Sequence, residues 1–190
     1  MTFVSMRPHV LGIDDGPFDK RQKRPVRVVA VLMEGNDLVE GMALGEFPVD
    51  GDDATGFLVE WIKTLRWEPA LQAVVLGGIT LAGLGLVDLE SLAARLGIPV
   101  LAATRRGTAK SRVSEALTAA CLADRLPIVD RSPPAIRVRP GLYVAFAGTD
   151  AQHAIALIES TLRKSRMPEP LRLAHLIASA IERGQSHGRV

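Results

Sequence analysis

The sequence predicts an α/β fold in which one mixed sheet is flanked by helices. Its first part contains three strand-like segments, residues 9–13, 26–33 and 38–49, which is typical of an antiparallel β-meander. After residue 53, strand-like and helix-like segments alternate, as they do in βαβα units. The length of 190 residues is that of one domain, so we expect a single domain over residues 1–190.

Each strand of the meander is predicted from an apolar run. The first is short, and the second, VRVVAVLM, is continuous and rich in β-branched residues, as a central strand would be. The sequence from Glu34 to Asp37 predicts a hairpin turn after it. Gly41 and Gly45 interrupt the third strand, so we expect a bulge or a sheet edge there.

The rest of the chain is predicted to alternate between strands and helices. Apolar periodicity predicts helices at residues 53–65, 87–96, 111–123, 150–162 and 171–181, with Ser111 as an N-cap. Strands are predicted at residues 72–76 and 98–103, followed by a hairpin of residues 136–138 and 142–146. A meander followed by βαβα units in one sheet indicates a ribonuclease H-like fold, and a doubly wound nucleotide-binding sheet is the alternative.

Composition excludes several classes of protein. The net charge of +2 is too small to indicate a nucleic-acid binder by itself, although residues 104–112 and 163–166 are basic. The one cysteine, Cys121, excludes an internal disulfide and a cysteine-rich zinc site, and we expect it in the core. The start of the chain lacks the pattern of a secretory signal, and the longest uncharged run, residues 73–87, is too short to span a bilayer. We therefore expect a soluble cytoplasmic protein with no membrane partner.

Carboxylates gather where two strands of the meander end. Asp14 and Asp15 follow the first strand, and Asp50, Asp52 and Asp53 follow the third. Neighbouring strand ends would bring these groups within a few ångströms, where a divalent cation such as Mg²⁺ relieves their repulsion. The alternative is structural, because Asp is a common helix N-cap and Asp-Gly pairs are common turns.

A glycine-rich loop, Gly77 to Gly85, follows a predicted strand and precedes a predicted helix. In that position Gly78 and Thr80 could approach a phosphate group. The loop matches neither the dinucleotide fingerprint nor the P-loop, so a tight loop packed on the sheet is the alternative. No motif of a serine hydrolase or a zinc peptidase is present in the sequence.

Four segments together resemble a known family: "LGIDDGPF", "VDGDDATGFL", "GGITLAGLGLVDL" and "LGIPVLAATRRG". They are similar, in order and position, to a mainly archaeal family of unknown function related to endonuclease V. The resemblance covers residues 7 to 182, approximately. It implies a ribonuclease H-like fold and strand cleavage near deaminated adenine, with magnesium held by acidic residues.

The resemblance also implies roles for individual residues. Asp14, in Gly12-Ile13-Asp14, matches the principal metal ligand of the first strand, and Asp53 lies near the place of a glutamate ligand. Asp52 is a further candidate ligand, and Asp15 is expected in an outer shell. "RMPEPLRLAH", which ends at His175, is similar to the closing helix of endonuclease V, where a histidine near the metal occupies this place.

The chain departs from the endonuclease V pattern at three places. The histidine-proline element of the glycine-rich loop is absent, and residues 80–84 replace it. Gly77 stands where that family has a metal-binding aspartate, and Asp88 is the nearby residue that could substitute for it. Phe47 and Pro48 are a remnant of the aromatic-proline wedge that opens a duplex.

The sequence thus predicts an endonuclease V-like protein that engages nucleic acid, single-stranded DNA or RNA, at a degenerate Mg²⁺ or Mn²⁺ site. Asp14, Asp53 and His175 are the predicted catalytic residues, and Asp14, Asp53 and Asp52 the predicted metal ligands. Phosphate binding is assigned to Gly78, Thr80, Arg105 and Arg106. The alternatives are a non-catalytic module that binds nucleic acid, a nucleotide or a protein, and a metal-dependent hydrolase of a small phosphorylated molecule.

Overall fold

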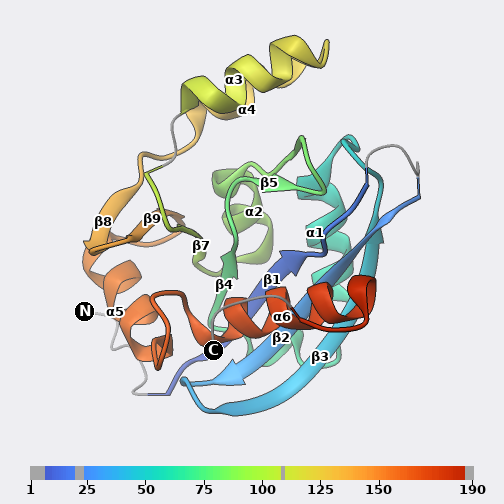
Figure 1. Cartoon of the computed structure of the whole chain (residues 1–190). Helices are drawn as coiled ribbons and strands as arrows, with labels where there is room; N and C mark the ends of the chain where they lie inside the picture. Colours follow the sequence, from blue (N-terminus) through green and yellow to red (C-terminus); the bar gives the residue numbers. More distant parts are fainter. Residues whose placement is uncertain (1–6, 20–23, 108–109, 187–190) are drawn as a thin grey trace.

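The computed structural model describes residues 7–19, 24–107 and 110–186 of the chain (Figure 1). A seven-stranded sheet has the order β3-β2-β1-β4-β7-β9-β8. Its strands are β1 (His9–Asp15), β2 (Val26–Glu34), β3 (Leu38–Phe47), β4 (Ala73–Leu76), β7 (Val100–Thr104), β8 (Ile136–Arg139) and β9 (Leu142–Ala147).

The sheet is mixed, as the sequence predicts. β1, β4 and β7 run parallel, whereas β2 and β3 on one side and β9 and β8 on the other pair antiparallel to their neighbours. The meander β1-β2-β3 and the βαβα part therefore share one sheet. The carboxyl ends of the three parallel strands lie at the same edge, which is where α/β sheets place their ligand sites.

Helices cover both faces of this sheet (Figure 1). α1 (Ala54–Lys63) and α2 (Leu89–Leu96) pack on one face, in the main aliphatic core. α5 (Ala151–Thr161) and α6 (Glu169–Arg183) pack on the opposite face, and α6 crosses β1 and β2. α3 (Lys110–Ala119) and α4 (Leu126–Arg131) pack on each other and project from the sheet.

β3 is both an edge strand and bulged, as its glycines predict. The register between β2 and β3 shifts at Leu32 and Met33. A Cβ at Gly41 would lie 2.7 Å from the ring of Trp67, and one at Gly45 would lie 3.0 Å from Trp61. The two glycines therefore make room for tryptophans that cover this face of the strand.

Several smaller features differ from the prediction. β1 continues through Asp14 and Asp15, and a two-stranded hairpin, β5 (Thr80–Leu81) and β6 (Gly85–Leu86), lies within the glycine-rich loop. The short helices η2 (Glu68–Ala70), η3 (Ala123–Arg125) and α4 were not predicted, because three to six residues carry too little periodicity.

Two residue assignments near α3 are wrong. Ser111 lies inside α3, whose first residue is Lys110, so it is not the N-cap. Cys121 is exposed rather than buried, because the chain turns there with a positive φ of 59° just beyond the helix. The apolar face of the helix ends before this turn.

Within the described ranges, none of the helices combines the length and apolar character that crossing a bilayer requires.

Candidate active site

Gly12 in β1 and Gly16, directly after this strand, allow α6 to pack closely onto the sheet. A Cβ at Gly12 would lie 2.2 Å from the backbone carbon of Pro170, and one at Gly16 would lie 3.2 Å from the carbonyl oxygen of Ala178. α6 therefore contacts β1 almost backbone to backbone. This close approach decides which side chains of α6 can reach the end of β1.

The side chain that reaches it is His175. Its Nδ1 lies 2.8 Å from Oδ2 of Asp14, across 161 residues of sequence. The side chain of His175 is 54% exposed and that of Asp14 is 19% exposed, so the pair stands at the surface of the sheet edge. The hydrogen bond to Asp14 raises the pKa of His175 above the ordinary value, while burial and the charge of Arg105 oppose the rise. The structure thus brings together two of the three predicted catalytic residues.

Asp15 points to the other side of the strand. Its Oδ2 accepts a hydrogen bond from the backbone N–H of Ala82 at 3.1 Å, at the tip of the β5–β6 hairpin. Burial, and then the negative charge of Asp14, raise the pKa of Asp15 to about 6. Asp15 is therefore close enough to Asp14 for the two charges to repel, although successive strand residues face opposite ways.

Two cavities meet at this pair of aspartates. An open pocket of about 270 Å³ is lined by Asp14, Asp15, His175, Ser179 and Arg183, among others. A small cavity of about 10 Å³ on the other side is lined by the two aspartates together with residues of β4 and the glycine-rich loop, among them Gly77, Gly78 and Thr80. The predicted residues Gly78 and Thr80 thus lie beside Asp14.

The glycine at position 77 has a local consequence. A Cβ at Gly77 would lie 2.6 Å from Oδ1 of Asp14. The Asp14 carboxylate therefore occupies the space that any larger side chain at position 77 would need. At the position where the endonuclease V pattern has a second carboxylate, the Asp14 carboxylate of this chain fills the space.

The carboxylates that follow β3 hold the surrounding loops together. Asp53 is the N-cap of α1, and its Oδ1 accepts from the N–H of Gly56 at 2.8 Å. Asp52 pairs with the buried guanidinium of Arg125. Together with Asp14 they do not form, within the described residues, a trio whose ligand atoms lie within 4.8 Å of one another.

Arg125 is a structural residue that sequence reasoning missed. Its Nη1 donates to the carbonyl oxygens of Asp50 and Leu84 at 2.9 and 2.8 Å, and Oδ1 of Asp50 accepts from the N–H of Leu84 at 2.8 Å. Arg125 therefore ties the loop after β3 to the hairpin that contacts Asp15. The sequence signal that could have indicated a cationic partner for this loop is its cluster of three aspartates between positions 50 and 53.

We expected the glycine-rich loop to lead directly into a helix, but it does not. The β5–β6 hairpin intervenes, and α2 is capped by Asp88, whose Oδ1 accepts from the N–H of Ser91 at 3.1 Å. Burial alone would raise the pKa of Asp88, but the hydrogen bonds from Arg131 and Ser91 outweigh it, so the pKa is lowered. Asp88 is thus occupied at the helix start, and nothing in its contacts makes it a substitute for the missing ligand.

Positive charge lies around this edge of the sheet. Arg105 and Arg106 are exposed, directly after β7, and the hydroxyl of Thr104 donates to the carbonyl oxygen of Arg106 at 2.7 Å. Thr104 is also a neighbour of Gly78.

The predicted remnant of a duplex-opening wedge does not project from the surface. Phe47 is buried, with its ring centroid 5.0 Å from that of Phe57.

The chain is similar in sequence and in fold to known proteins. The UPF0215 protein of Methanothermobacter thermautotrophicus is 32% identical over 203 aligned residues, which cover 99% of this chain and 99% of that protein. A crystal structure of a protein of unknown function from Archaeoglobus fulgidus has a TM-score of 0.84 at 33% identity, covering 96% of this chain and 100% of that one.

The fold is also that of a nuclease. Endonuclease V of Ciona intestinalis, solved with a 24mer DNA containing an inosine, has a TM-score of 0.55 at 14% identity and covers 88% of this chain and 82% of that one. This likeness confirms the predicted ribonuclease H-like fold. A family model described as Endonuclease dU matches residues 7–182. The chain therefore belongs to the Endonuclease dU family, which is related to endonuclease V.

Proposed function

We propose that this protein hydrolyses phosphodiester bonds of nucleic acid at a divalent-metal site centred on Asp14, with His175 as its partner. The observation that carries the proposal is the 2.8 Å contact between His175 Nδ1 and Asp14 Oδ2 at the wall of an open pocket. This acid–base pair lies at the carboxyl end of β1, at the sheet edge where the basic end of β7 is also found.

The donor set fits a hard divalent cation. Asp14 and Asp15 line the same pocket, and their mutual repulsion contributes to the raised pKa of Asp15. Mg²⁺ and Mn²⁺ take oxygen ligands, and Mg²⁺ needs only one or two carboxylates because it keeps several waters. When bound, such an ion polarises a phosphodiester and favours ionisation of water. A role for Asp53 and Asp52 as ligands stays a prediction, which would require them to leave Gly56 and Arg125.

The protein's own residues have distinct tasks in this proposal. Asp14 holds Nδ1 of His175, so the opposite ring nitrogen, Nε2, is available to a phosphate or a leaving oxygen. The raised pKa of His175 favours the protonated ring, which can donate that proton. Arg105, Arg106 and Arg183 supply positive charge along the path of a strand.

The names of the similar proteins suggest which strands to test. The family name contains both "endonuclease" and "dU", and endonuclease V of Ciona intestinalis was solved with DNA containing an inosine. Labelled single strands with one deoxyuridine, one inosine or neither should therefore be incubated with Mg²⁺, with Mn²⁺ or with a chelator.

We expect metal-dependent cuts by the wild-type protein and a loss of at least about 100-fold in rate for Asp14→Ala. Asp124→Ala is the matched control, because Asp124 is an exposed carboxylate on η3 that lines neither cavity. Cuts that persist in Asp14→Ala, or that fall equally in Asp124→Ala, would contradict the proposal.

A second function is supported by a specific observation. Asp52 and Asp53 are engaged by Arg125 and Gly56, and position 77 has no carboxylate. A site reduced in this way suits a module that binds nucleic acid without cutting it. Salt-dependent binding of strands with no metal-dependent cuts would select this module, whereas failure to bind any strand at low salt would favour a small phosphorylated substrate.

A further inference from the structure

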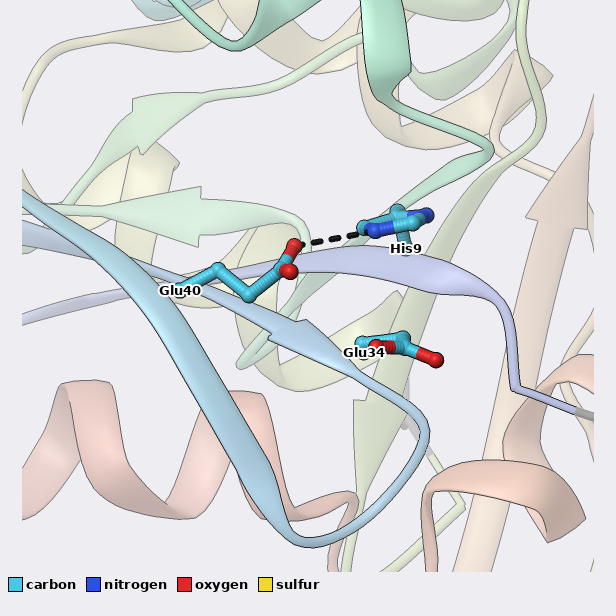
Figure 2. A group of neighbouring side chains, drawn as sticks. All are labelled: His9, Glu34 and Glu40. Atoms are coloured by element: carbon cyan, nitrogen blue, oxygen red, sulfur yellow. Dashed lines mark ion pairs between the residues drawn. The ribbon is translucent and has the colours of Figure 1, made fainter.

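A second group of metal-binding side chains lies at the other end of the sheet. His9 begins β1, five residues before Asp14, and pairs in register with Glu34, the last residue of β2. Glu40 lies near the start of β3. Three neighbouring strands therefore each contribute one side chain here (Figure 2).

A bulge in β3 directs Glu40 towards this place. Leu32 pairs with Gly41 and Met33 pairs with Val39, so Glu40 is the extra residue of the bulge. An extra residue shifts the alternation of side chains across the strand and can re-aim one of them. The Glu40 carboxylate consequently reaches across β2, and its Oε2 lies 2.9 Å from Nε2 of His9 (Figure 2).

The ligand atoms of the three residues are closely spaced. One ring nitrogen of His9 and one carboxylate oxygen each of Glu34 and Glu40 all lie within 4.8 Å of one another. Around a tetrahedral Zn²⁺ with bonds near 2.0–2.1 Å, ligand atoms are separated by roughly 3.3 Å. Small side-chain movements at this partly exposed surface therefore suffice to reach bonding geometry.

The backbone of His9 is fixed from the opposite side. Oε1 of Gln72 accepts from the N–H of His9 at 2.9 Å, and the N–H of Gln72 donates to the carbonyl oxygen of His9 at 2.9 Å. Gln72, His9 and Glu34 also line an open cavity of about 770 Å³. Water or another small ligand can thus complete the coordination of an ion bound by three protein residues.

We propose that His9, Glu34 and Glu40 form a binding site for one divalent transition-metal ion of the zinc class. Imidazole nitrogen and carboxylate oxygen are both ligands of Zn²⁺, whereas Mg²⁺ favours oxygen ligands alone. The site is separate from the Asp14 centre, because none of its residues lines the two cavities there.

Arg7 provides a sharp test of this site. Its Nε donates to Oε1 of Glu34 at 3.0 Å, and its Nη2 donates to Asp37 at 2.7 Å. An ion at the site competes with the Arg7 guanidinium for Glu34. If the three residues formed only a surface ion-pair network, removal of Arg7 would not raise the affinity of the protein for a metal ion.

The experiment is calorimetric titration of the full chain with Zn²⁺ near neutral pH, after removal of metal with a chelator. We expect one saturable Zn²⁺ per chain at the wild-type site, and a loss of roughly tenfold or more in affinity for His9→Ala and for Glu40→Gln. Arg7→Ala should bind Zn²⁺ more tightly than wild type, because Glu34 is released. Mg²⁺ at the same concentration should give no saturable heat that His9→Ala removes.

Asp14→Ala is the control, and it should bind Zn²⁺ at this site as wild type does. Circular dichroism of each variant tests whether the fold is kept, and Glu40→Gln alters only a partly exposed side chain. Absence of a stoichiometric zinc site in wild type, or equal affinity in His9→Ala, would overturn the proposal. Loss of binding in Asp14→Ala alone would assign the metal to the other centre instead. No outcome of this titration depends on nuclease activity.

Discussion

Single residues at the end of β1 carry the chemistry of the candidate active site. Asp14 and Asp15 are adjacent, yet one holds His175 and the other holds the N–H of Ala82. Alternation along the strand gives the two carboxylates different surroundings, and burial is the largest cause of the raised pKa of Asp15. Asp15 is partly buried beneath the hairpin, whereas Asp14 contacts His175 at the wall of the open pocket.

Substitution of Asp14 should lower the pKa of His175. In Asp14→Asn the hydrogen-bond partner loses its charge, so the hydrogen bond that is the largest cause of the raised pKa of His175 is weakened and the charge attraction is removed. NMR titration of the His175 ring in chelated buffer measures this directly. The ring signal of His153, which lies on α5 and does not line the Asp14 pocket, is the internal reference. An unchanged His175 titration would show that the contact with Asp14 does not hold the ring in solution.

Neutralising Asp15 should stabilise the protein at neutral pH. The folded pKa of about 6 lies above the unfolded value of 3.8, so the unfolded chain ionises first as pH rises. Stability from this group is full below about pH 4, falls through the window up to about pH 6, and stays reduced above it. The difference between the folded and unfolded pKa of Asp15 corresponds to about 3 kcal/mol of lost stability above pH 6. Asp15→Asn removes this loss, because it carries no charge, and it keeps an oxygen that can accept from the N–H of Ala82.

Urea denaturation of Asp15→Asn and wild type at several pH values, without divalent metal, tests this. The gain in free energy of unfolding should vanish at low pH and be largest above pH 6, approximately, where the folded protein would otherwise carry the charge. A gain independent of pH would mean that ionisation of Asp15 is not its cause.

At the scale of elements, the packing of α6 on β1 positions the histidine. The sequence Gly-Ile-Asp serves two purposes: its glycine admits the helix backbone and its aspartate meets the helix one turn later. Ala174 and Ala178 of α6 are buried against Val29 and Val31 of β2, so the side chains on the face of the helix that meets the sheet are small. Helix position and active-site geometry are therefore set by the same contacts.

Gly12→Ala should separate α6 from β1. The new methyl group would lie 2.2 Å from a backbone atom of Pro170, which cannot rotate away, so we expect a loss of about 3 kcal/mol or more in stability. His175 should also lose its raised pKa as it moves from Asp14. Chemical denaturation and NMR measure the two effects.

Gly97→Ala is the matched glycine control. Gly97 has a positive φ of 70° but nothing within 4 Å of an added Cβ, so only about 1 kcal/mol of conformational strain is expected. Similar losses in the two variants would mean that space at Gly12 is not what the helix requires.

On the scale of the whole molecule, charge is arranged unevenly despite the net value of +2. Arginines after β7 and at the end of α6 lie at the edge of the sheet where the Asp14 pocket opens, and His9, Glu34 and Glu40 lie at the opposite end. Net charge therefore underestimates what one edge of the sheet can attract.

Removal of two arginines at that edge should weaken binding to any single strand. In Arg105→Ala/Arg106→Ala the two proposed phosphate contacts would be lost, so the slope of log affinity against log salt should fall by about 1.4. Fluorescence anisotropy over a range of salt concentrations measures the slope. Arg137→Ala/Arg163→Ala removes the same charge from exposed positions elsewhere and should change the slope less. Equal changes would indicate attraction by total charge alone.

The sequence by itself determined the mixed sheet, its meander and the pairing of motif residues with strand ends, because strand and helix periodicities are local properties of the chain. It also singled out Asp14 and His175, through motifs that lie 161 residues apart. The tertiary structure alone decided that they touch, that Gly77 gives its space to Asp14, and that Asp52 and Asp53 hold loops. These outcomes depend on which distant groups satisfy each buried polar atom, and no local pattern specifies that.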